Sequence, residues 1–311
     1  MADQGKPVHA GAETVAATGA VTAPPPPWAR YGVELRRLTR RFARSKSGVI
    51  GGALVLLLVA TALLAPWIAP YDPLQMAAGG MLEAPSSAHL FGTDEFGRDL
   101  FSRVIYGAAL TLRVGLVAVG ISLTTGFLIG IVAGYARGWA ERILMRSADV
   151  LFSFTETLIA LAAVAVLGPS LNNAIIAVGI AQVPFYARVT YSVVLVETSR
   201  PYIDAGKAIG ASHLRMIFLH VLPNVVPPMI VVASLGVSTA VLTTAGLSYL
   251  GLGAQPPLPE WGYMLAAGQN YFRNAPWIMI FPGVAIALAV LGFNLLGDGI
   301  REVLDPRQRD V

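Results

Sequence analysis

The sequence predicts an all-α polytopic membrane protein with six transmembrane helices. Of its 311 residues, 55% are hydrophobic and only 13% are charged, against about 25% charged residues in a typical soluble domain. The mean hydropathy of +0.64 exceeds what one soluble core could bury. The apolar residues form runs of about 20, which is the length of an α-helix that crosses the hydrocarbon layer. A lone strand would leave its backbone groups unsatisfied there. The runs are about residues 49–69, 114–134, 147–167, 174–194, 225–247 and 276–297.

Two further regions precede the first run. Residues 1–29 are rich in Ala, Gly and Thr and end in four prolines, so we expect a disordered cytoplasmic tail. Residues 30–47 are basic and predict a helix on the membrane surface, acting either as a positive-inside anchor or as a lipid or regulatory site. The first run is too long and begins too far along the chain for a cleaved signal peptide.

The positions of Lys and Arg predict the orientation of the chain. Most of them lie before the first run, between the second and third, between the fourth and fifth, and after the sixth. These are alternate connections, and basic residues in short loops mark the cytoplasmic side. Both termini are therefore predicted to be cytoplasmic. The spanning domain covers residues 48–300, and residues 301–311 form the cytoplasmic C-terminus.

The first external connection, about residues 70–110, combines a polar turn with an amphipathic helix. Gly92 and Gly97 favour bends at the turn, and apolar residues recur at helical spacing from Phe101 to Ala108. The charged residues of the turn are Asp94, Glu95, Arg98 and Asp99.

The fifth connection, residues 252–275, is also external in this orientation. Its three prolines predict a rigid loop. Trp261 and Trp277 are expected near the membrane interface, where tryptophan is enriched.

The stretch 201–224 carries too much charge for a bilayer core, yet its pattern is that of two short helices. Pro201 suits a first helical turn, and Gly210 can take the left-handed conformation that ends a helix. Ser212 can cap a second helix, which Pro223 is expected to stop before the fifth span. The residues alone leave two interpretations open, a surface that docks a partner protein or a plain re-entry loop.

The order DAGKAIG, followed after nine residues by HVLP, resembles the EAA motif of ABC importer permeases. The resemblance implies that this loop forms a coupling helix, which fits a cleft in an ATPase subunit. Asp204 stands where the family usually has Glu, and Gly206 where it usually has the second Ala, so acidity and small size are kept. The implied coupling residues are Asp204, Ala205, Gly206, Lys207, Gly210 and Pro223.

Three other segments resemble the dipeptide, oligopeptide and nickel permease group within that family. They are LFGTDEFGRDLFSRVIYGA, LSYLGLGAQPP and FNLLGDGIREVLDP. The long segment after the first span is similar to that of the C-type subunit, which pairs with a B-type permease. Together the resemblance covers about residues 40–308 and implies a type I ABC importer permease fold, half of a pore for peptides or similar small solutes, in a bacterial inner membrane.

The resemblance implies the other components as well. They are a B-type permease, two ABC ATPase subunits and an extracytoplasmic substrate-binding protein, which we expect to dock on the polar turn of Asp94, Glu95, Arg98 and Asp99. No Walker A pattern is present, so ATP and Mg²⁺ are assigned to the ATPase subunits. We expect no bound cofactor or metal and no nucleic acid, with membrane lipid as the surroundings.

Two other classes of function fit the sequence less well. The sequence GLSYLG around Ser248 is similar to a serine nucleophile motif, but no histidine falls at membrane depth to serve as its base, so no catalytic residue is predicted. An ion-coupled secondary transporter would need interrupted helices and intramembrane carboxylates in repeated halves. No repeat is visible in the sequence, and Glu156 is the one carboxylate deep within a run.

Glu156 lies nine residues beyond the start of the third run, which in a straight helix corresponds to roughly 14 Å. A carboxylate at that depth costs about 2.5–3.5 kcal/mol on insertion scales, so it should face protein or water. Two hypotheses follow. Glu156 lines the translocation path and favours solutes with a cationic group, or it pairs with a neighbouring helix or with the partner permease.

Overall fold

The regular structure of the described residues is helical. The computed structural model describes residues 39–304. The predicted tail, residues 1–29, lies outside the described residues, as do residues 30–38 of the predicted surface helix and residues 305–311 at the C-terminus.

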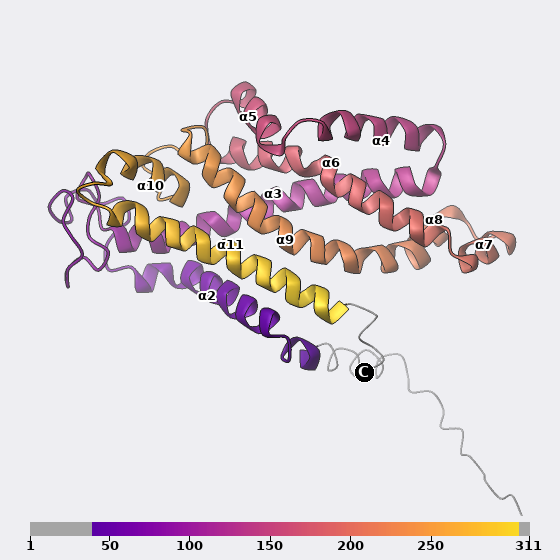
Figure 1. Cartoon of the computed structure of the whole chain (residues 1–311), viewed down its shortest axis with the longest axis horizontal. Helices are drawn as coiled ribbons and strands as arrows, with labels where there is room; N and C mark the ends of the chain where they lie inside the picture. The colour runs from indigo at the N-terminus through magenta and orange to yellow at the C-terminus, as the bar shows by residue number, and fades with distance from the viewer. Residues whose placement is uncertain (1–38, 305–311) are drawn as a thin grey trace, which may run out of the picture. The chain divides into compact units, whose positions relative to one another are not determined.

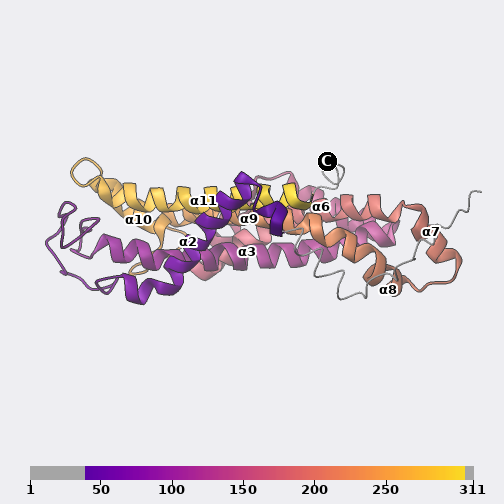
Figure 2. The same ribbon diagram turned by 90° about the horizontal axis from the view of Figure 1, so that it is seen from below.

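Five helices among the described residues are long and apolar enough to cross a membrane, judged by length and composition. Figures 1 and 2 show the long helices alongside one another, with α7 and α8 at one end and α10 and the loop before α3 at the other. The five are α2, Lys46–Ile68; α3, Leu100–Ala136; α6, Leu171–Thr198; the helix His213–Tyr249, whose last part is α9, Leu222–Tyr249; and α11, Trp277–Leu304.

The predicted third span is broken in the structure. It forms α4, Trp139–Phe152, and α5, Glu156–Leu167, which meet at 90° and together make the sixth candidate span. The Thr155 side chain caps α5 by accepting a hydrogen bond from the backbone N–H of Leu158 at 3.4 Å. The straight helix expected over residues 147–167 is therefore wrong, and so is the depth of Glu156 that was inferred from it.

A seam of small residues joins α3 to α6. Gly126, Gly130 and Gly134 recur at every fourth position and face Tyr186, Thr190 and Val194 of α6. Small residues at this spacing let two membrane helices approach closely, which dispersion contacts then stabilise.

Replacing Gly130 with Ala should destabilise the protein by about 1–3 kcal/mol, the usual cost of overpacking. The added Cβ would lie 2.5 Å from Thr190 Cβ and 2.7 Å from the Ala187 carbonyl oxygen, so the helices must separate. The midpoint of thermal unfolding in lipid nanodiscs measures the effect. The matched control is Gly120→Ala on the same helix, where a Cβ meets nothing within 4 Å. Equal midpoints for the two variants would contradict this account of the seam.

The fifth span begins earlier than the sequence predicts. α8, His213–Met216, continues through a π-helical turn, Ile217–Val221, directly into α9. Pro223 therefore does not stop the helix, contrary to the prediction. In the π turn, the Leu222 N–H bonds to the carbonyl of Ile217, five residues earlier, and not to that of the residue four earlier. The backbone is therefore wider at this turn, which leaves room for the ring of Pro223.

The fifth connection contains a further short helix, α10, Trp261–Gly268, followed by the 3₁₀ turn Gln269–Tyr271. The Trp261 indole is only 2% exposed and donates a hydrogen bond of 2.9 Å to the carbonyl oxygen of Val104 in α3. This side chain packs inside the protein against Gly107, so it does not face lipid, and its depth in the membrane stays a prediction. Trp277 is partly buried and donates to the Thr93 carbonyl at 3.3 Å.

The first and last spans are antiparallel neighbours. Gly48 of α2 packs against Gly299 of α11, and a Cβ at Gly292 would meet Leu54 at 3.0 Å. The start of α2 and the end of α11 consequently lie at the same end of the bundle, on the side toward α7 in Figures 1 and 2.

Candidate functional site

The loop between α6 and α9 forms the short helix predicted there. α7 spans Pro201–Ala208, with Pro201 in its first turn. Gly210 follows with φ of 79°, a left-handed conformation that costs glycine little. The Ala211 N–H reaches back to the Gly206 carbonyl at 3.1 Å, which closes the end of the helix. Ser212 then caps α8 by accepting from the Arg215 N–H.

The two faces of α7 differ. Asp204, Ala205 and Lys207 are exposed, and Lys207 Nζ lies 3.5 Å from Asp204 Oδ1. Ile203 is buried, and a Cβ at Gly206 would lie 2.8 Å from the Met216 sulfur. The small size of Gly206 thus serves packing within the chain, whereas the sequence suggested a surface that a partner approaches.

A buried carboxylate anchors α7 to the spans on both sides. Glu197, at the end of α6, is 4% exposed; its Oε2 lies 2.9 Å from Arg200 Nε, and its Oε1 accepts a hydrogen bond from the Tyr202 hydroxyl. Asn224 Nδ2 donates to that hydroxyl oxygen at 3.3 Å and to the carbonyl oxygen of His220 at 2.7 Å. Burial, and then the bond to Glu197, raise the pKa of Tyr202, which keeps the donor proton in place. The carboxylate therefore links α6, α7 and the start of α9.

Sequence reasoning missed this anchor. The available signal was an acidic residue, Glu197, at the end of an apolar span, three residues before a basic one. Such a pair is common at helix ends, and only the fold shows that the Tyr202 hydroxyl donates to Glu197 and accepts from Asn224.

Apolar side chains surround the exposed face of α7. Ile209 is 86% exposed, and three residues of the following helical turns are more than half exposed. These turns belong to the candidate span His213–Tyr249, so their exposed apolar side chains suit either lipid or a partner protein. The three are Leu214, Phe218 and Leu219.

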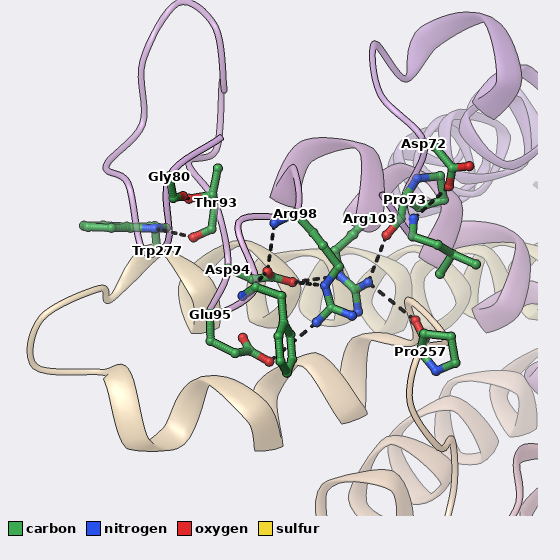
Figure 3. Close-up of polar contacts among 12 residues, drawn as sticks. Asp72, Pro73, Gly80, Thr93, Asp94, Glu95, Arg98, Arg103, Pro257 and Trp277 are labelled. Carbon is green, nitrogen blue, oxygen red and sulfur yellow. Dashed lines mark hydrogen bonds and ion pairs between the residues drawn. The ribbon is translucent and has the colours of Figure 1, made fainter. Parts of the chain in front are cut away.

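At the opposite end, the charged turn before α3 is an internal network (Figure 3). Arg98 Nε lies 2.6 Å from Asp94 Oδ2, and Arg98 Nη2 lies 3.5 Å from Glu95 Oε1. Arg103 from α3 approaches the same Asp94 oxygen at 3.5 Å and donates to the Pro73 carbonyl at 3.0 Å. Asp94, Arg98 and Arg103 are each at most 3% exposed. These charges hold the segment together from inside.

The other two charged residues of the turn, Asp99 and Glu95, differ in their exposure to solvent. Asp99 is fully buried, caps α3 by accepting from the Ser102 N–H at 2.8 Å, and lies 2.9 Å from His89 Nδ1. Glu95 is the one member of the four that stays partly accessible. Its burial nevertheless raises its pKa, against the lowering effects of a backbone hydrogen bond and of Arg98 and Arg103.

Glu156 is the first residue of α5 and is half-buried. Its Oε1 accepts a hydrogen bond of 2.7 Å from Gln182 Nε2 of α6 and lies 3.5 Å from Thr243 Oγ1 of α9. The same side chain borders a cavity of about 360 Å³ at the break between α4 and α5. The structure thus places Glu156 in contact with the neighbouring helices α6 and α9 and at the edge of a cavity. Its place on a translocation path stays a prediction.

Ser248, considered above as a nucleophile, is fully buried. Its Oγ accepts a hydrogen bond of 3.0 Å from the Ala254 N–H and stabilises the turn after α9.

Two models of known protein families match parts of this chain. Residues 126–310 match the family model described as binding-protein-dependent transport system inner membrane component, and residues 35–85 match the N-terminal TM domain of oligopeptide transport permease C.

Two curated relatives cover most of the chain. The di/tripeptide transport system permease protein DppC of Pseudomonas aeruginosa is 45% identical, over 90% of this chain and 95% of the relative. The glutathione transport system permease protein GsiD of Pectobacterium atrosepticum is 43% identical, over 88% and 91%. Among solved structures, an inward-facing conformation of the MetNI methionine ABC transporter is similar in fold, with a TM-score of 0.55 and 20% identity over 65% of this chain and 97% of that one.

Proposed function

Because the chain belongs to the family of binding-protein-dependent transport system inner membrane components, we propose that it forms half of the translocation pore of an ATP-driven importer of peptides or similar small solutes. The family makes it a multi-pass permease subunit with the type I ABC importer fold. The 45% identity to a di/tripeptide permease supports peptides as the proposed class of substrate. The family also favours this transporter class over an ion-coupled secondary transporter.

The complete transporter would contain four other subunits. A B-type permease supplies the second half of the pore, two ABC ATPase subunits bind ATP and Mg²⁺, and an extracytoplasmic binding protein delivers the solute. Both termini then lie in the cytoplasm. The shared location of the start of α2 and the end of α11, toward α7, supports this orientation.

α7 is the coupling helix of the proposal. Asp204, Ala205 and Lys207 face outward toward the ATPase, while Gly206, Gly210 and Pro223 shape the support behind them. Closure of the ATPase dimer pushes on α7, and the Glu197 anchor transmits the movement to α6 and α9. Transport then alternates between two packings of the helices.

The external segment is the proposed docking surface for the binding protein. Asp94, Arg98 and Asp99 fix its shape from within, and Glu95 with the exposed loop around it offers the contact. A rigid platform of this kind costs little ordering entropy when a partner binds.

Uptake tests the function directly. The permease, its B-type partner, the two ATPase subunits and the binding protein are reconstituted in proteoliposomes, and accumulation of radiolabelled dialanine is followed with and without ATP. The proposal expects accumulation that needs both ATP and the binding protein. Accumulation driven by an ion gradient without ATP would contradict it.

The coupling surface can be tested by crosslinking, because the native chain has no cysteine. In the Ala205→Cys variant, a thiol-attached photo-crosslinker in native membranes should capture an ATPase subunit, with a yield that changes with bound nucleotide. Ala205 is chosen because it is exposed, whereas a side chain at Gly206 would collide with Met216. The control is Ser87→Cys in the exposed external segment, which should capture no ATPase. Capture of lipid alone at residue 205 would leave α7 as a plain re-entry element.

A further inference from the structure

The cavity beside Glu156 has an unusual lining. It measures about 360 Å³, which falls in the usual range of small-ligand sites of about 300–1,000 Å³. Its walls are mainly aromatic and aliphatic, and Glu156 is the one charged residue among those that line it. Four apolar lining residues are Phe152, Phe154, Ile159 and Phe185.

The carboxylate is held with spare acceptor capacity. Gln182 Nε2 donates to Glu156 Oε1, while the other amide atom, Gln182 Oε1, is buried without a hydrogen-bond partner among the described residues. Within residues 39–304, Glu156 Oε2 has no donor either. Gln182 is 3% exposed, so its free oxygen has lost water without gaining a protein donor. Buried acceptors normally find a donor. Gln182 Oε1 has none although it is buried, and Glu156 Oε2, on a half-buried side chain at the edge of the cavity, can still accept one.

No cation in the part of the chain that the structure describes supplies that donor. Arg188, on the same helix as Gln182, is already paired with Asp149. The position of Glu156 in the first turn of α5 places its charge at the positive end of the helix dipole, which stabilises a carboxylate without a paired base. The site is therefore negative and rich in acceptors. An alkylammonium group, with three donors and no acceptor, matches that chemistry.

We propose that Glu156, held in position by Gln182, forms a receptor for the protonated primary amine of the transported solute. The inference rests on the proposed function, because it places the receptor on the path of the imported molecule. It implies that solutes with a free amino group are preferred over the same solutes with that group acylated. The apolar walls would accept the remainder of the molecule with little selectivity.

The test measures the charge preference of the cavity without relying on transport. Ile159 lines the cavity, so the Ile159→Cys variant of the assembled transporter places the chain's one thiol there. The rates of modification by the cationic reagent 2-aminoethyl methanethiosulfonate and by neutral methyl methanethiosulfonate are compared by mass spectrometry of this chain. Glu156→Gln is then added to the same variant. Ser153→Cys, which lines the same cavity, provides a second position.

We expect the ratio of cationic to neutral rates to fall by about tenfold when Glu156 becomes Gln, because a nearby carboxylate concentrates the cation at the thiol. Dialanine should slow the modification in the Glu156 protein, and N-acetyl-dialanine should not. An unchanged ratio, or equal protection by both peptides, overturns the receptor. Absence of reaction with either reagent at both positions overturns it too, because the cavity is then covered, as by the partner permease. ATP-dependent uptake is scored separately, so its absence would contradict the importer and not the receptor.

Discussion

Replacing Asp94 with Asn should weaken the segment before α3 by about 3–5 kcal/mol, the usual cost of breaking a buried ion pair by removing one partner. The amide oxygen of the new side chain could still accept hydrogen bonds from the backbone N–H groups of Phe96 and Arg98, which now reach Asp94 Oδ1 at 2.9 and 3.0 Å. The turn geometry is therefore kept, and the loss is electrostatic. Arg98 and Arg103 would remain buried with Glu95 as their one nearby carboxylate in the network.

Hydrogen exchange of backbone amides between residues 79 and 100 measures this effect, because local opening reports the stability of the segment alone. Protection should fall by at least a hundredfold, which corresponds to about 3 kcal/mol. The control is Glu83→Gln, an exposed carboxylate in the same segment, for which a change within about 0.5 kcal/mol is expected. Similar protection in both variants would mean that the network does not hold the segment.

The second large effect concerns Glu197, which anchors α7, the proposed coupling helix. Replacing Glu197 with Ala should reduce the amount of solute imported per ATP hydrolysed by roughly tenfold to a hundredfold. The change removes contacts with Arg200 and Tyr202, and hydrogen bonds to a charged group contribute about 1.5–3 kcal/mol. α7 would still dock, but its movement would pass less completely to α6 and α9.

The ratio of transport to hydrolysis separates this role from a merely structural one. A variant that only assembled poorly would lose transport and stimulated hydrolysis together, leaving their ratio unchanged. Tyr202→Phe keeps the ring but loses the hydroxyl that contacts Glu197 and Asn224, so an intermediate loss is expected. The control is Ser199→Ala, whose hydroxyl bonds only to the carbonyl oxygen of Val196 and faces solvent. An unchanged ratio in Glu197→Ala would rule out transmission through this residue.

The sequence by itself determined which segments are helical and where several of them begin. Long apolar runs must become helices, because lipid offers no partner to the backbone. Caps are equally local. Ser212 and Asp99 each bond to an N–H three residues ahead, and Gly210 turns through a left-handed conformation that favours glycine. The short helix α7 could be predicted for the same reason, because the residues that begin and end it are contiguous in the sequence.

The tertiary structure decided which side of each helix or turn is buried by other parts of the chain. The turn of Asp94 and Arg98 looked like a charged surface, but α3 brings Arg103 to it and closes it. Gly206 was expected to meet a partner, yet Met216 packs against it. The 90° bend between α4 and α5 and the π turn before Pro223 also depend on the fold, although the Thr155 cap that begins α5 is a local signal. Burial and backbone register depend on residues far apart in the chain, and neither composition nor periodicity contains that information.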